Sequence, residues 1–123
     1  MHGTLSHPDR FDYLVDLAQA VDAVRASRTP YCLVGHTHVP FVFEYDLSQQ
    51  RMTRALHTPQ ELAAVRLAEA PEPVRYVINP GSVGQPRDGD PRAGAAALDT
   101  DARTLSLCRL AYDIERAQRK ILE

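Results

Sequence analysis

Residues 31–40 read Tyr-Cys-Leu-Val-Gly-His-Thr-His-Val-Pro, a short apolar run that opens onto a glycine and two histidines. Such a run is typical of a buried strand that ends at a loop. In extended backbone, side chains two residues apart return to the same side, so His36 and His38 can project into one cleft. Gly35 permits close backbone approach or a positive φ, and Pro40 stiffens the exit of the loop.

This pair of histidines has two interpretations. Neutral imidazole is the commonest nitrogen ligand for Zn, Mn and Fe, so His36 and His38 can bind one ion or two neighbouring ions. Taken alone, however, a His-x-His is more often a pair of ordinary surface or core histidines. The remaining sequence has to decide between them.

Three helices and several strands are predicted around this motif. Apolar residues recur at spacings of three and four over residues 9–27, which predicts an amphipathic helix with Asp9 as its N-cap. Thr58-Pro-Gln-Glu61 is a capping-box pattern and predicts a helix that continues to about Ala70. A last helix is expected over residues 113–122. The predicted strands cover residues 31–34, 41–45, 51–55, 74–79, 93–98 and 104–110. The fold class is therefore α/β, a mixed sheet flanked by helices.

Composition narrows the function. The 123 residues carry a formal net charge of -2, and Lys and Arg are scattered among Asp and Glu, so we expect no dedicated nucleic-acid surface and a small substrate. No apolar run approaches the roughly 20 residues of a membrane span. Cys32 and Cys108 have apolar neighbours and are expected to be reduced core thiols, which suits a cytoplasmic protein.

Three motifs together resemble the calcineurin-like metallophosphoesterase superfamily, in a bacterial and archaeal branch. Residues 35–40 fit its last metal motif, Gly-His-Thr-His-x-Pro, and His2-Gly3 stands where the family has an earlier His-Gly pair ahead of a helix. Residues 79–87 reproduce the branch's Asn-Pro-Gly-Ser-Val-Gly-Gln-Pro-Arg, the most specific of the matches. Tyr112-Asp113-Ile114 before the final helix is also similar, so the resemblance covers nearly the whole chain.

The resemblance implies a site and a reaction. His2 and His36 would be ligands of the second metal of a binuclear centre and His38 a ligand of the first, with Mn, Fe or Zn as the ions. Such centres hydrolyse phosphomonoesters or phosphodiesters with a metal-activated water. Arg87 is a candidate to bind the substrate phosphate, while the rest of residues 79–87 is expected to support the histidine loop. His7 and His57 match no motif and are expected at the surface.

The chain also departs from the family. The family's Asp-x-His, Gly-Asp-x-x-Asp and Gly-Asn-His motifs do not occur in this sequence. We therefore expect residues 1–123 to be the C-terminal portion of the domain, half of the αββα sandwich, incomplete for catalysis alone. An internal start codon, a truncated or split gene, and a relic without catalysis would each explain this.

Two other functions and one partner follow from the same departure. If the missing half supplies the second sheet, an apolar sheet face should be exposed to pair with that half or with a second copy. The first rival function is a binding or scaffold module on the same fold. The second is a histidine-only structural zinc site in an unrelated α/β domain, which leaves residues 79–87 unexplained.

Overall fold

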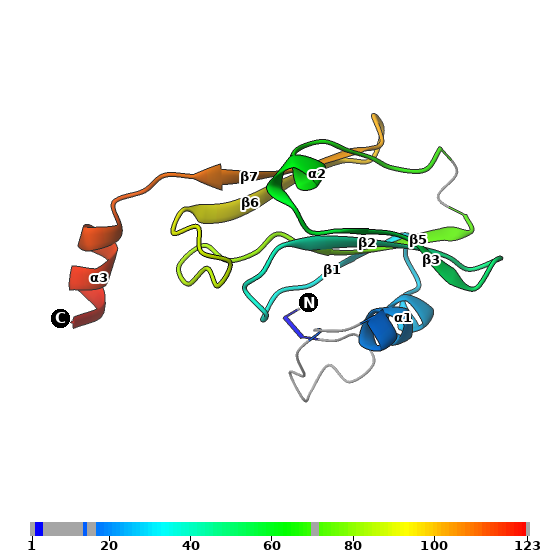
Figure 1. Cartoon of the computed structure of the whole chain (residues 1–123), viewed down its shortest axis with the longest axis horizontal. Coiled ribbons are helices and arrows are strands. Elements are labelled where there is room, and N and C mark those ends of the chain that lie inside the picture. The colour runs from blue at the N-terminus through cyan, green and yellow to red at the C-terminus, as the bar shows by residue number, and fades with distance from the viewer. Residues whose placement is uncertain (1, 4–13, 15–16, 70–71, 123) are drawn as a thin grey trace.

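The computed structural model describes the chain apart from residues 1, 4–13, 15–16, 70–71 and 123. Two β-sheets face each other, and a helix covers the outer side of the larger sheet (Figure 1). The four-stranded sheet has the order β1 (Tyr31–Leu33), β5 (Val74–Asn79), β2 (Phe41–Asp46), β3 (Arg51–Leu56). The three-stranded sheet has the order β4 (Val65–Arg66), β7 (Thr104–Leu110), β6 (Ala93–Asp99). The helices are α1 (Leu17–Ala26), α2 (Pro59–Ala63) and α3 (Ile114–Leu122).

Side-chain alternation in the central strands creates two cores. Val77 of β5 is fully buried with α1 on the outer face, whereas Tyr76 and Ile78 are buried between the two sheets. Phe43 and Val42 of β2 divide in the same way. Because successive strand residues point to opposite faces, a strand that is apolar throughout needs cover on both sides. The mixed sheet with flanking helices is thus confirmed.

The expectation that the second sheet would be missing is wrong. Strands β4, β6 and β7 of this chain form it, and the buried Leu105 of β7 packs in the core between the sheets. The sequence patterns had predicted strands 93–98 and 104–110 without indicating that they leave the first sheet. Each sheet of the sandwich therefore takes strands from this one chain.

The predicted helix over residues 58–70 is much shorter than expected. Its capping box is present: the Thr58 hydroxyl accepts from the Glu61 amide at 3.3 Å, and the Glu61 carboxylate accepts from the Thr58 amide at 3.0 Å. The helix nevertheless ends at Ala63, because Ala64 is extended and Val65 pairs with Leu105 of β7. Burial of alternate residues from Val65 onward outweighs the helical propensity of this alanine-rich stretch.

The other expectations have mixed outcomes. Strands β1, β2, β3, β5, β6 and β7 lie where predicted. Asp9, the expected N-cap, lies outside the described residues. Cys32 is buried, but Cys108 is exposed, so the prediction of a second core thiol is wrong. Among the described residues, no helix is long and apolar enough to cross a membrane.

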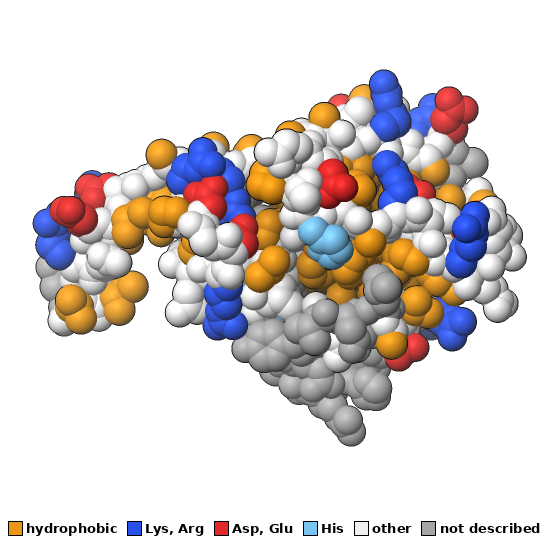
Figure 2. All heavy atoms as spheres, in the orientation of Figure 1, with side chains coloured by type: hydrophobic (Ala, Val, Ile, Leu, Met, Phe, Trp, Pro, Cys, Tyr) orange, Lys and Arg blue, Asp and Glu red, His pale blue; other side chains and the backbone are white. Residues whose placement is uncertain are grey.

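Helix α3 extends away from the two sheets (Figure 1) and buries none of its residues. Hydrophobic side chains gather on it and on the segment that leads to it (Figure 2). Ile121 and Leu122 are 83% and 87% exposed, and Leu110 at the end of β7 is 54% exposed.

Candidate functional site

The histidine loop, residues 35–40, follows β1 and has an unusual backbone. His36 and His38 have φ angles of 72° and 63°, in the left-handed region that non-glycine residues seldom adopt. Backbone of this kind persists where surrounding contacts fix it, and it concentrates at binding and catalytic sites. One such contact is the hydrogen bond from the Gly35 amide to the His2 carbonyl, 3.0 Å long, which joins the loop to the start of the chain.

His2 and His36 face each other directly. His2 Nε2 and His36 Nδ1 are 2.8 Å apart, and the rings meet edge to face with centroids 4.6 Å apart. At a zinc–nitrogen distance of 2.0–2.1 Å, two nitrogen ligands of a tetrahedral ion lie about 3.3 Å apart. A separation of 2.8 Å is therefore about half an ångström short of that geometry. In the structure a hydrogen bond joins the two nitrogens, and their separation is close to that of two ligands of one ion.

The surroundings of His36 favour its neutral form. The pKa of His36 is lowered from its ordinary value, first by partial desolvation and then by His2, His38 and Arg87. Three positively charged or ionisable groups thus disfavour a positive charge on this imidazole. A lowered pKa leaves the ring nitrogen lone pair available at a lower pH.

His38 is oriented by the loop that follows β5. Its Nδ1 is 2.7 Å from the Gln85 carbonyl oxygen. Because a carbonyl oxygen only accepts, Nδ1 carries a proton, and in a neutral ring Nε2 then keeps its lone pair. Histidine ligands of metals are commonly held in this way by a backbone carbonyl. The Arg87 amide donates to the His38 carbonyl at 3.3 Å, so the two loops contact each other twice.

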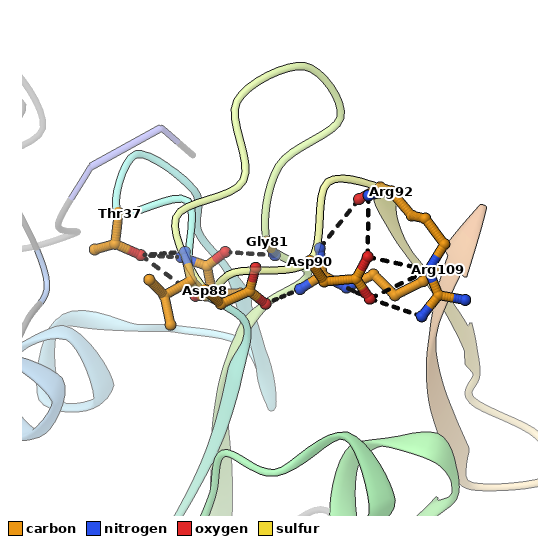
Figure 3. Close-up of polar contacts among 8 residues, drawn as sticks. Thr37, Gly81, Asp88, Asp90, Arg92 and Arg109 are labelled. Atoms are coloured by element: carbon orange, nitrogen blue, oxygen red, sulfur yellow. Dashed lines mark hydrogen bonds and ion pairs between the residues drawn. The ribbon is translucent and has the colours of Figure 1, made fainter. Parts of the chain in front are cut away.

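Asn79, at the end of β5, connects the same two loops through its side chain. Its side chain is fully buried and donates to the Gly35 carbonyl at 3.1 Å and to the Thr37 hydroxyl at 2.8 Å. Its Oδ1 accepts from the Gly81 amide at 2.9 Å (Figure 3). The prediction that residues 79–87 support the histidine loop is confirmed. The sequence did not single out Asn79, although a polar residue ending an apolar strand was the available signal.

Arg87 is exposed near these histidines. Its guanidinium has a hydrogen bond of 3.4 Å to the Gln85 side chain, and it lines a hollow of about 330 Å³ together with Thr37, Phe43 and His57. His57 is exposed as predicted, with its ring edge against Phe43. His7 lies outside the described residues. Within the described part of the chain, no group of three or more His, Cys, Asp or Glu side chains could hold a metal ion.

Comparison with known proteins agrees with this geometry. A sequence model of the calcineurin-like phosphoesterase superfamily domain matches residues 1–103. An uncharacterized protein of Methanocaldococcus jannaschii, MJ0912, is 33% identical over 122 residues, which are 99% of this chain and 44% of that protein. The crystal structure of a metallophosphoesterase from Sphaerobacter thermophilus has a TM-score of 0.77 and 34% identity, and the match covers 99% of this chain and 47% of that one. The chain spans about half the length of these relatives. The chain belongs to the calcineurin-like phosphoesterase superfamily.

Proposed function

We propose that this chain supplies the histidine side of a metal-dependent phosphoesterase centre that hydrolyses small phosphomonoesters or phosphodiesters. His2, His36 and His38 bind the ions, which are Mn, Fe or Zn. The observation that carries the proposal is the distance of 2.8 Å between ring nitrogens of His2 and His36, which are 34 residues apart in the sequence. Membership of the phosphoesterase superfamily supports the same chemistry.

Each residue has a definite part in this proposal. His2 and His36 direct their ring nitrogens at one point, and His38 presents Nε2 because Gln85 holds its other nitrogen. Divalent ions at such a centre lower the pKa of a water molecule and offset charge on phosphoryl oxygens. Arg87 binds the phosphoryl group, since its guanidinium can donate two parallel hydrogen bonds to one phosphate.

The histidines alone are not a complete centre. Two divalent ions bring four positive charges, and three neutral imidazoles offset none of them. No Asp or Glu in the described residues joins the histidines in a group that could hold an ion. We therefore propose that carboxylate ligands come from a partner segment, equivalent to the half of the relatives that this chain does not match.

The test measures metal content and the hydrolysis of p-nitrophenyl phosphate and its bis ester in added Mn²⁺. It compares the chain alone with the chain fused behind the remaining half of the Sphaerobacter thermophilus metallophosphoesterase. The fused protein should bind metal and hydrolyse at least one of the two esters. His36→Ala should abolish both properties, whereas Gln49→Ala, in the exposed hairpin between β2 and β3, serves as the control and should retain them.

Two results would go against the proposal. If the fused protein binds no metal, the proposed metal site is wrong. A fused protein that binds metal at the histidines yet hydrolyses neither ester would favour the scaffold function.

A further inference from the structure

The loop that joins β5 to β6, residues 80–92, contacts the histidine loop on one side and the second sheet on the other. Its contacts with the second sheet converge on Arg109 of β7 (Figure 3). We call residues 80–92 the bridging loop. Because Gln85 and Arg87 of this loop are hydrogen-bonded to His38, whatever fixes the bridging loop also acts on the geometry of His38.

Arg109 binds the bridging loop at several points. Its guanidinium forms an ion pair and hydrogen bond with the Asp88 carboxylate, and it donates to the Arg92 carbonyl at 3.2 Å. Its Nε lies 4.0 Å from Asp90 Oδ2. The Arg109 side chain is only 15% exposed, so water screens these contacts less than at an open surface.

The strand next to β7 brings the bridging loop within reach of Arg109. Gly94 of β6 pairs with Arg109, and the Gly94 amide donates to the Ser82 carbonyl at 2.7 Å. A Cβ at residue 94 would lie 2.5 Å from the Pro80 carbonyl oxygen, so the loop rests directly on this glycine. Arg109, opposite Gly94 in the register, therefore lies beside the same loop and binds Asp88 and the Arg92 carbonyl.

The contacts at Asp88 lead directly to the histidines. Asp88 follows Arg87, whose amide donates to the His38 carbonyl. Gln85, three residues before Asp88, is the acceptor that leaves the His38 proton on Nδ1. Fixing Asp88 therefore fixes the short segment that determines which His38 nitrogen is free.

Arg109 also affects the charge beside Arg87. Asp88 is the nearest carboxylate in sequence to Arg87, yet it pairs with Arg109. Asp90 is paired with Arg92 at 2.7 Å. The charges of Asp88 and Asp90 are therefore balanced by Arg109 and Arg92. The Arg87 guanidinium does not pair with Asp88, so it can bind an anion.

We propose that Arg109 is a positioning residue of the phosphoesterase site: it holds the bridging loop so that Gln85 fixes the His38 tautomer and Arg87 stays available for phosphate. The proposal rests on the proposed function for its purpose, but its physical claim concerns only this chain.

The test uses Arg109→Met, which removes the guanidinium and keeps an unbranched side chain. Arg92→Met is the matched control, because Arg92 belongs to the same cluster and its side chain pairs with Asp90 alone among the described residues. The ring nitrogens of His38 are observed by 15N NMR at pH 8 in the absence of metal. Wild type and Arg92→Met should show a protonated Nδ1, whereas Arg109→Met should show a mixture of both tautomers.

Two further readouts accompany the NMR. Amide hydrogen exchange at Arg87 should be faster in Arg109→Met and unchanged in Arg92→Met. In the fused protein, titration with Mn²⁺ should show about 10–100-fold weaker binding in Arg109→Met, the usual effect of losing a group that orients a ligand. If Arg109→Met does not fold, Arg109→Lys replaces it, since one ammonium group cannot make all the contacts of the planar guanidinium.

An unchanged His38 tautomer in a folded Arg109 variant would overturn the proposal. Failure of the proposed function gives a different result. Wild type would then bind no Mn²⁺ even when fused to the partner half, while the tautomer change in Arg109→Met would still appear.

Discussion

Replacing Asn79 by Ala tests whether one buried amide holds the histidine loop. The side chain makes three hydrogen bonds, to Gly35, Thr37 and Gly81, and is fully buried. At about 1 kcal/mol for each bond, the free energy of unfolding should fall by about 3 kcal/mol. The Gly35 carbonyl and the Gly81 amide each lose a hydrogen-bond partner. The expected loss in the free energy of unfolding is therefore near the upper end of the range for single substitutions.

The measurement is urea unfolding of wild type, Asn79→Ala and Gln49→Ala, followed by circular dichroism. Gln49 is the matched control because it is also a hydrogen-bonded amide, but it lies exposed in the hairpin between β2 and β3. Its replacement should change the free energy of unfolding by less than about 0.5 kcal/mol. A loss below about 1 kcal/mol for Asn79→Ala would refute the argument, since water or backbone adjustment would then be satisfying these groups.

Four further predictions concern pH, packing, strain and association. Burial by itself would raise the pKa of Glu44, but hydrogen bonds, chiefly from Arg54, lower it on balance. The ionised Glu44 therefore stabilises the fold fully above its unfolded pKa, and this stabilisation is lost as the pH falls through the lower folded pKa. Glu44→Gln should reduce the fall of the urea midpoint with decreasing pH, measured from pH 6 to pH 2. Gly94→Ala should destabilise the protein by about 1–3 kcal/mol in urea unfolding, because the new Cβ would lie 2.5 Å from a loop carbonyl oxygen; a neutral effect would mean that the bridging loop can move freely. Since His36 has a φ of 72°, His36→Gly should unfold at higher urea than His36→Ala, with a difference of about 1 kcal/mol, and equal stability would remove the strain argument. Light scattering should show self-association of the chain that weakens in Ile121→Ser, because this side chain is 83% exposed; a monodisperse wild-type monomer would contradict the prediction.

The sequence predicted the strands well because their apolar patterns are local. It could not predict that β6 and β7 form a separate sheet, because the same alternation suits either sheet. It also overextended α2, since the pairing of Val65 with Leu105 joins residues 40 positions apart and leaves no local signal. Long-range pairing explains both errors.

The candidate site divides in a similar way. Motifs indicated His2, His36 and His38, and the structure brings the first two into contact. No motif indicated Arg109, because its role depends on register: it lies opposite Gly94, and only the folded sheet places it over the bridging loop. Residues that hold other residues in place are invisible to spacing rules, since their partners lie far away in sequence.

The left-handed backbone at His36 and His38 explains why the second sheet belongs to the site. Each such residue costs on the order of 1–3 kcal/mol, and such backbone persists only where surrounding contacts fix it. The compensating hydrogen bonds come from Asn79, Gln85 and Arg87, and the last two lie on a loop that Arg109 secures from the other sheet. The orientation of His38 therefore depends on the packing of both sheets. A fragment containing only the first sheet would retain the three histidines but lose the contacts by which Arg109 secures the bridging loop.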